Sequence, residues 1–229
     1  MSLRAFTLIE LLIVVAIIAI LISILAPILA SSRRSAEAAV CLSQLREIGM
    51  ATTAYMTDND DYFPRSTHSA LAYGVLPWGY VIIPYLGREP YTGPGPDWDL
   101  LFNKLYRCKA DPRTDCWSYG KSVWFELTAG ETGELAGIAE GPTYTKSSDV
   151  THPSTTILYG ELGSGSMADH IMAHVWYWGG TPEVDARRHG MTSNYVFVDG
   201  HAEPWQFHST FDLTTGIDLW KPGAIDIRQ

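Results

Sequence analysis

The sequence has little positive charge. Its 229 residues include 16 Lys and Arg against 25 Asp and Glu, which gives a net charge of −9 at pH 7. Nucleic-acid binding depends on basic side chains that displace counterions from phosphates. Because the chain has no basic stripe, we expect no nucleic acid among its partners.

The sequence also lacks the familiar patterns of catalytic sites. It has no nucleophilic Ser or Cys motif, no glycine-rich phosphate loop and no recognisable pair of carboxylates. His170 and His174, beside Asp169, have the spacing of two metal ligands on a helix, but the glutamate of the metalloprotease motif is absent. The aromatic residues that follow favour a strand instead. We therefore expect no enzymatic activity and no cofactor.

Cysteine is scarce, and its count of three is odd. Cys108 and Cys116 lie in one loop-like stretch whose spacing fits no common zinc site. An oxidising compartment would favour a disulfide between them. Closing a loop of this length should contribute roughly 2.6 kcal/mol in the chain-entropy model. Cys41 would then remain as a small apolar residue on a helix.

Charge is almost absent from Phe6 to Ala30, where Glu10 is the only charged residue. As a helix, these 25 residues would be roughly 37 Å long, more than the ~30 Å hydrocarbon core of a bilayer. The run therefore predicts a membrane span, with Arg4 keeping its start in the cytoplasm. A cleaved secretory signal fits less well, because the run is long and its best cleavage site, 28–30, begins with a bulky residue.

The segment 5–12, AFTLIELL, resembles the processing site of type IV prepilins and type II secretion pseudopilins. The resemblance implies that residues 1–5 form a leader, that a prepilin peptidase cuts between Ala5 and Phe6, and that Phe6 is then methylated. It also implies that Glu10 is the family's invariant glutamate and that Pro27 is its helix-bending proline. Ala5 stands where the family usually has glycine.

The resemblance suggests a partner for Glu10. A carboxylate in hydrocarbon is costly unless it is paired. The new amino group of Phe6, in the same subunit or the next, would offset the desolvation of both charges and set the axial register. Alternatively, Glu10 reaches the headgroups as an ordinary charge at a helix end.

The helix is predicted to continue beyond the span as an amphipathic stretch over residues 31–62. Apolar or small residues recur there at three- and four-residue spacing: Ala38, Cys41, Leu42, Leu45, Ile48, Gly49, Thr52, Tyr55 and Met56. Polar residues occupy the remaining positions: Arg33, Arg34, Glu37, Gln44, Arg46 and Glu47. The run 58–64 is rich in turn-forming residues and closes with proline, so it should end the helix. A calcium loop fits less well, because the run lacks the Gly and Glu that such a loop requires.

Residues 63–229 are predicted to form one globular domain rich in β-structure. Strands are expected at 117–127, 154–162 and 174–178, a surface loop at 129–141, and a short helix or edge strand at 80–86. Alternating apolar residues around Asp199-Gly200 predict a tight hairpin over 194–207. His189 precedes Asp199 with nine residues between them. The two could form a hydrogen-bonded pair that pins the hairpin, or contribute to an ion site.

Residues 41–64 and 187–203 resemble a subgroup of large pseudopilin-like proteins, with His189, Asp199 and Gly200 matching its C-terminal signature. This implies an α+β, pilin-like fold in which a long N-terminal helix packs on a C-terminal antiparallel sheet with irregular loops. Calcium, which major pseudopilins bind in a C-terminal loop, remains possible, although no ligand set identifies it here.

The expected function is that of a structural subunit of a type II secretion pseudopilus-like filament. The resemblance implies these partners: a prepilin peptidase and methyltransferase, other pilin or pseudopilin subunits, an inner-membrane assembly platform and membrane lipid. The precursor would cross the bacterial inner membrane once, with a periplasmic domain, before joining a periplasmic or extracellular filament. Two alternatives stay open, namely a type IV pilus subunit for adhesion or motility and a pilin-anchored binding or enzymatic module.

Overall fold

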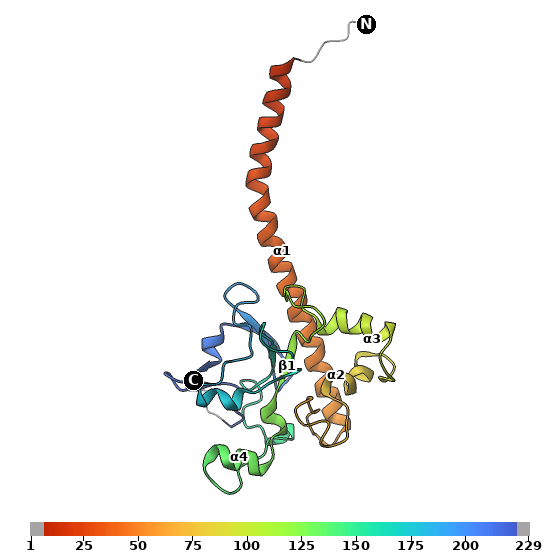
Figure 1. The fold of residues 1–229 in the computed structure, drawn as a ribbon, viewed down its shortest axis with the longest axis vertical. Coiled ribbons are helices and arrows are strands. Elements are labelled where there is room, and N and C mark those ends of the chain that lie inside the picture. Colours follow the sequence, from red (N-terminus) through yellow and green to blue (C-terminus); the bar gives the residue numbers. More distant parts are fainter. Residues whose placement is uncertain (1–6, 224–229) are drawn as a thin grey trace.

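A computed structural model describes residues 7–223, and its dominant feature is one long helix (Figure 1). Helix α1 runs without interruption from Leu8 to Asp58, so the predicted span and amphipathic stretch are one element. It ends where the turn-forming run begins, and Asp60 and Asp61 both have positive φ, at 51° and 70°. This confirms the turn interpretation of 58–64, because Asp is one of the few residues that tolerates the left-handed region.

Only the second half of α1 is buried. Its buried positions fall on one face at three- and four-residue spacing, as predicted: Cys41, Gln44, Leu45, Ile48, Gly49, Ala51, Thr52 and Met56. Gln44 was expected on the polar face. It is buried because its side chain bridges two neighbours, donating to the carbonyl of Lys104 and accepting from the Tyr119 hydroxyl at 2.6 Å.

The domain contains a five-stranded sheet in the order β3-β1-β2-β4-β5. The strands are β1 (Tyr119–Ser122), β2 (Ile157–Glu161), β3 (His170–Ile171), β4 (Ser193–Phe197) and β5 (Ala202–Trp205). All neighbours are antiparallel except β1 and β3, which pair in parallel. A long helix packed on a largely antiparallel sheet is the α+β, pilin-like arrangement that was predicted.

Short elements fill the rest of the domain. The helices are α2 (Trp78–Val81), η1 (Ile83–Leu86), α3 (Pro96–Leu101), η2 (Phe102–Tyr106), η3 (Val123–Glu126), α4 (Ala129–Ala136), η4 (Ser147–Asp149), η5 (Ala173–Trp178) and η6 (Phe207–Ser209). A separate two-stranded sheet joins β6 (Phe211–Asp212) and β7 (Ile217–Asp218).

Three local predictions are wrong. The stretch 174–178 is the 3₁₀ helix η5 rather than a strand, and 129–141 contains α4 rather than only a loop. The predicted strand 117–127 is extended only in β1 before it turns into η3. Helix α4 begins with a capping box between Thr128 and Glu131, the local signal that identifies a helix start in this polar sequence.

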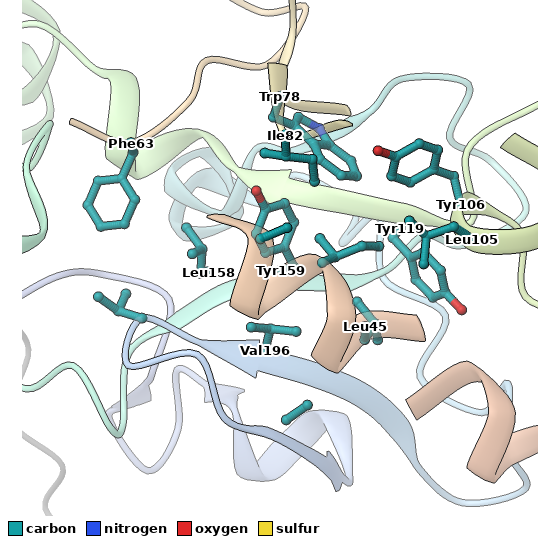
Figure 2. Close-up of a cluster of buried hydrophobic side chains, with 14 of the residues drawn as sticks. Leu45, Phe63, Trp78, Ile82, Leu105, Tyr106, Tyr119, Leu158, Tyr159 and Val196 are labelled. Carbon is teal, nitrogen blue, oxygen red and sulfur yellow. The ribbon is translucent and has the colours of Figure 1, made fainter. Parts of the chain in front are cut away.

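Strand β4 is buried on both faces of the sheet. Val196 of β4 faces α1 in a cluster with Leu45, Tyr159 and Trp78 (Figure 2). Its neighbours Tyr195 and Phe197 belong to a second cluster, which contains Trp176 and Trp220. Fully burying an apolar side chain stabilises the fold by about 1.5–3 kcal/mol. Strand β4 therefore contributes side chains to two cores, one of which includes α1.

Candidate functional site

His189 lies directly before β4, and Asp199 lies just after it. The His189 Nε2 atom is 2.9 Å from Glu161 Oε1, whereas the Asp199 carboxylate pairs with His201 Nδ1. The predicted His189–Asp199 pair is therefore wrong. Five of the nine intervening residues form the extended strand Ser193–Phe197, so the two side chains lie beyond opposite ends of β4.

The Asp199-Gly200 turn belongs to the predicted hairpin, which β4 and β5 form. The connection is longer than a two-residue turn, and Gly200 adopts a φ of +89°. A Cβ on Gly200 would lie 3.1 Å from Thr53 Oγ1 of α1. Glycine is suited to this position for two reasons: the turn needs a residue with positive φ, and helix α1 lies too close to leave room for a side chain.

Cys108 is disulfide-bonded to Cys41 of α1, and Cys116 is a free, buried thiol. The predicted Cys108–Cys116 disulfide is therefore wrong. The loop between them is held by other bonds, because Arg113 donates to both oxygens of Asp111 and to the carbonyl of Trp117. Burial alone would raise the pKa of Asp111, but the hydrogen bonds from Arg113 and the charge of Arg188 outweigh it and hold that pKa below its usual value.

The disulfide, His189 and Glu161 meet at one place, which we call the Cys–Glu–His cluster (Cys41, Cys108, Glu161 and His189). One ligand atom from each residue lies within 4.8 Å of the others. Cys108 Sγ is 3.7 Å from His189 Nε2. The sequence indicated His189 and Cys108 separately, but it predicted Cys41 to be only a small apolar residue on the helix. Glu161 was missed because it lies in an apolar strand with no motif around it.

His170 and His174 do not lie one turn apart on an α-helix, because His170 belongs to β3 and His174 to the 3₁₀ helix η5. His170 Nδ1 is 3.1 Å from Asp169 Oδ1, while the His174 ring lies edge-on to Trp124. Burial, reinforced by the charges of His68 and His170, lowers the pKa of His174 to about 4.

The start of α1 has its own hydrogen-bonded arrangement. The Glu10 carboxylate accepts from the backbone N–H and hydroxyl of Thr7, at 2.8 and 2.7 Å, and the Thr7 hydroxyl accepts from Glu10 N–H. This capping box satisfies donors that the first turn of a helix leaves free. Ala5 and Phe6 lie outside the described residues, so the cleavage site and the pairing of Glu10 with Phe6 remain predictions.

No other part of the described chain covers the apolar half of α1. Its large hydrophobic side chains from Leu8 to Leu29 are 46–81% exposed, and the helix is long and apolar enough to cross a membrane. Pro27 lies within it and cannot donate the N–H that would otherwise bond the carbonyl of Ser23. Figure 1 shows this half of the helix projecting away from the domain.

Residues 2–26 match the family described as "Prokaryotic N-terminal methylation motif". The chain carries a prepilin-type N-terminus. No curated protein and no solved structure matches the chain. The methylation motif ends before the globular domain, so His189, Asp199 and Gly200 lie outside the matched segment.

The methylation motif supports a type IV pilin-like or pseudopilin subunit. It implies processing by a prepilin peptidase and assembly with other pilin subunits. Together with the bare apolar helix behind it, the motif suggests that the chain is anchored in a membrane.

Proposed function

We propose that the chain is a structural subunit of a pseudopilus-like filament of the type II secretion kind, with no enzymatic role. One observation carries the proposal: the methylation motif at 2–26 overlaps the apolar half of a 51-residue helix that the domain leaves bare. Exposed apolar side chains each cost about 1.5–3 kcal/mol in water relative to burial. Lipid would cover them in the precursor, and the helices of neighbouring subunits would cover them in the filament.

In this proposal, successive segments of the chain lie in different environments. Residues 1–5 are the cytoplasmic leader, 6–30 span the inner membrane and later form the filament core, 31–62 continue the helix, and 63–229 form the periplasmic domain. Peptidase and methyltransferase act at Ala5 and Phe6, and an inner-membrane platform drives assembly.

Glu10 would set the register between subunits. Its carboxylate is already turned back towards the start of the helix, where it is bonded to Thr7. The amino group that cleavage creates on Phe6 is one residue from Thr7 in the chain, so it is within reach of Glu10 of the same or an adjacent subunit. Pairing these two charges would offset the desolvation that each suffers in an apolar core.

The test has two parts. Mass spectrometry of the protein from native membranes should find a chain that begins at N-methylated Phe6. Glu10→Val should leave membrane insertion intact and abolish cross-linking between subunits, whereas Glu47→Val, at an exposed position of the same helix, should leave cross-linking unchanged.

Three outcomes would contradict the proposal. A chain that keeps Met1 in cells with an active peptidase would exclude processing, and unchanged cross-linking in Glu10→Val would exclude its role in register. Filaments of this protein sheared from the cell surface would assign it to an extracellular pilus instead.

A further inference from the structure

We propose that the Cys–Glu–His cluster binds a zinc ion when the disulfide between Cys41 and Cys108 is reduced. The four residues come from separate parts of the chain: α1, the loop after η2, the end of β2 and the loop before β4. The fold nevertheless brings one donor atom of each to within 4.8 Å of the others. This inference does not depend on filament assembly, since all four residues lie in the domain or in the half of α1 packed against it.

The donor set suits zinc. Two thiolates, one imidazole nitrogen and one carboxylate oxygen are all established zinc ligands, with bond lengths of about 2.0–2.3 Å in a tetrahedral site. Such bond lengths place the ligand atoms about 3.3–3.8 Å from one another. Cys108 Sγ and His189 Nε2 are already 3.7 Å apart, and His189 Nε2 and Glu161 Oε1 are 2.9 Å apart. Small side-chain shifts, together with separation of the two sulfur atoms, would complete the site.

Hydrogen bonds from β4 hold the carboxylate of Glu161 in place. Glu161 Oε2 accepts hydrogen bonds from the Ser193 hydroxyl at 3.0 Å and from the backbone N–H of Asn194 at 2.9 Å. Both donors belong to β4, which pairs with the strand that carries Glu161. Hydrogen bonds of this kind orient a ligating carboxylate and are a regular part of protein metal sites. The other oxygen, Oε1, lies 2.9 Å from His189 Nε2 and also accepts from the side-chain amide of Asn194 at 3.3 Å.

An ion could reach the cluster from solvent. A cavity of about 230 Å³ is lined by His189 and its neighbours Arg188 and Gly190 on one side, and by the first exposed turns of α1 after the span on the other. The two cysteines themselves are buried, at 0% and 1% exposure. His189 therefore lies between the cavity and the sulfur atoms.

The disulfide and the metal would exclude each other. A dithiol reductant would transfer two electrons and two protons to the Cys41–Cys108 bond, leaving two thiols here and a disulfide in the reductant. Zn²⁺ would then bind both sulfurs as thiolates, together with an imidazole nitrogen of His189 and a carboxylate oxygen of Glu161, and release the two thiol protons. Either state ties α1 to the domain, by a covalent bond in one case and through the ion in the other.

The experiment uses the full chain in detergent micelles, before and after reduction by a dithiol that is then removed without oxygen. Co²⁺ is the probe, because thiolate-bound Co²⁺ has a sulfur-to-metal charge-transfer absorption. We expect one Co²⁺ per reduced chain with this absorption, none for the oxidised chain, and displacement of Co²⁺ by Zn²⁺. X-ray absorption of the Zn²⁺ form should show two sulfur and two nitrogen or oxygen ligands.

Variants locate the site. The double substitution Cys41→Ser and Cys108→Ser, which removes both thiolates, should abolish the charge-transfer absorption, and Ser193→Ala, which only loosens Glu161, should weaken binding about 10–100-fold. Cys116→Ser is the matched control, since it removes the one buried thiol outside the cluster and should change nothing. The proposal is overturned if the reduced wild-type chain takes up no Co²⁺, if the bound ion has no sulfur ligand, or if Cys116→Ser removes the site. The wild-type measurements decide the question even where a variant fails to fold.

Discussion

Gly49 of α1 is in direct contact with the turn at Gly200. A Cβ placed on Gly49 would lie 3.0 Å from the carbonyl oxygen of Gly200 and 2.8 Å from Val196 Cγ1. Both distances are shorter than a normal carbon contact, and one of the two neighbours is backbone. The helix and the β4–β5 hairpin therefore fit together only because one residue on each side has no side chain.

Substituting Gly49→Leu should destabilise the domain. Leucine favours a helix over glycine by up to about 1 kcal/mol, but overpacking a closed contact costs about 1–3 kcal/mol and occasionally more. We expect a net loss, measured as a lower free energy of unfolding in urea. Gly130→Leu in α4 is the control, because the nearest atom to its Cβ would be 3.9 Å away, and it should be neutral or stabilising. Equal effects of the two substitutions would show that the contact at Gly49 is unimportant.

The disulfide should be a major source of stability. It joins residues 67 apart, and closing a loop of that length contributes about 4 kcal/mol in the chain-entropy model. Cys41→Ser should lower the free energy of unfolding by roughly that amount, and Cys116→Ser by much less. Peptide mapping without reduction should recover a fragment that links Cys41 to Cys108. A fragment linking Cys108 to Cys116 would refute the pairing.

Stability should decrease as the pH falls below about 6.5, through His174. Its folded pKa of about 4 is below the ordinary value near 6.5, so the unfolded chain binds more protons between these two values. Stability is therefore complete above pH 6.5 and is lost progressively towards pH 4. His174→Gln should make the thermal unfolding midpoint depend less on pH over this range. The surrounding titratable groups, His68, His170 and Glu131, are kept unchanged in this variant.

The exposed His208 supplies the control for that experiment. His208→Gln should leave the pH profile as it is in the wild type. If His174→Gln and His208→Gln give the same profile as the wild type, the buried imidazole does not govern acid sensitivity.

Removing Glu126 should strongly destabilise the domain. Its carboxylate is 3.3 Å from the ammonium of Lys121, and both side chains are almost fully buried. Breaking a buried pair by removing one partner costs about 3–5 kcal/mol, because a charge is left without compensation. We expect Glu126→Gln to show a loss of that order in urea unfolding. Glu134→Gln, at an exposed position on α4, should have an effect close to zero.

Sequence periodicity was sufficient for α1 because a long helix buries or exposes residues at regular intervals. The same reasoning was less reliable in the domain. Residues 174–178 have the aromatic content of a strand, yet they form η5, since Trp176 is drawn into the core beside Trp220. Tertiary packing outweighs β-propensity over so short a segment.

The sequence did not predict which side chains that are distant in the chain contact each other in the fold. Cys108 and Cys116 were paired by proximity in the chain, but the fold places Cys108 against α1. The predicted hairpin itself argues against the His189–Asp199 pairing, because its first strand, from residue 194 to the turn at Asp199, extends between the two side chains. Glu161 as the partner of His189 could not have been found, since the two are 28 residues apart and meet only when β2 and β4 pair.

The buried part of α1 begins at Cys41, and ten residues, 31–40, separate it from the end of the apolar run at Ala30. None of residues 31–40 is buried, and as helix they are about 15 Å long, more than the width of a helix with its side chains. With 6–30 in lipid, this largely exposed segment would separate the tightly packed part of the domain from the headgroups, although Ala110 and the 188–190 loop line a cavity with it. If the subunit leaves the membrane for a filament, as we propose, the packed part of the domain would not have to be separated from the bilayer first.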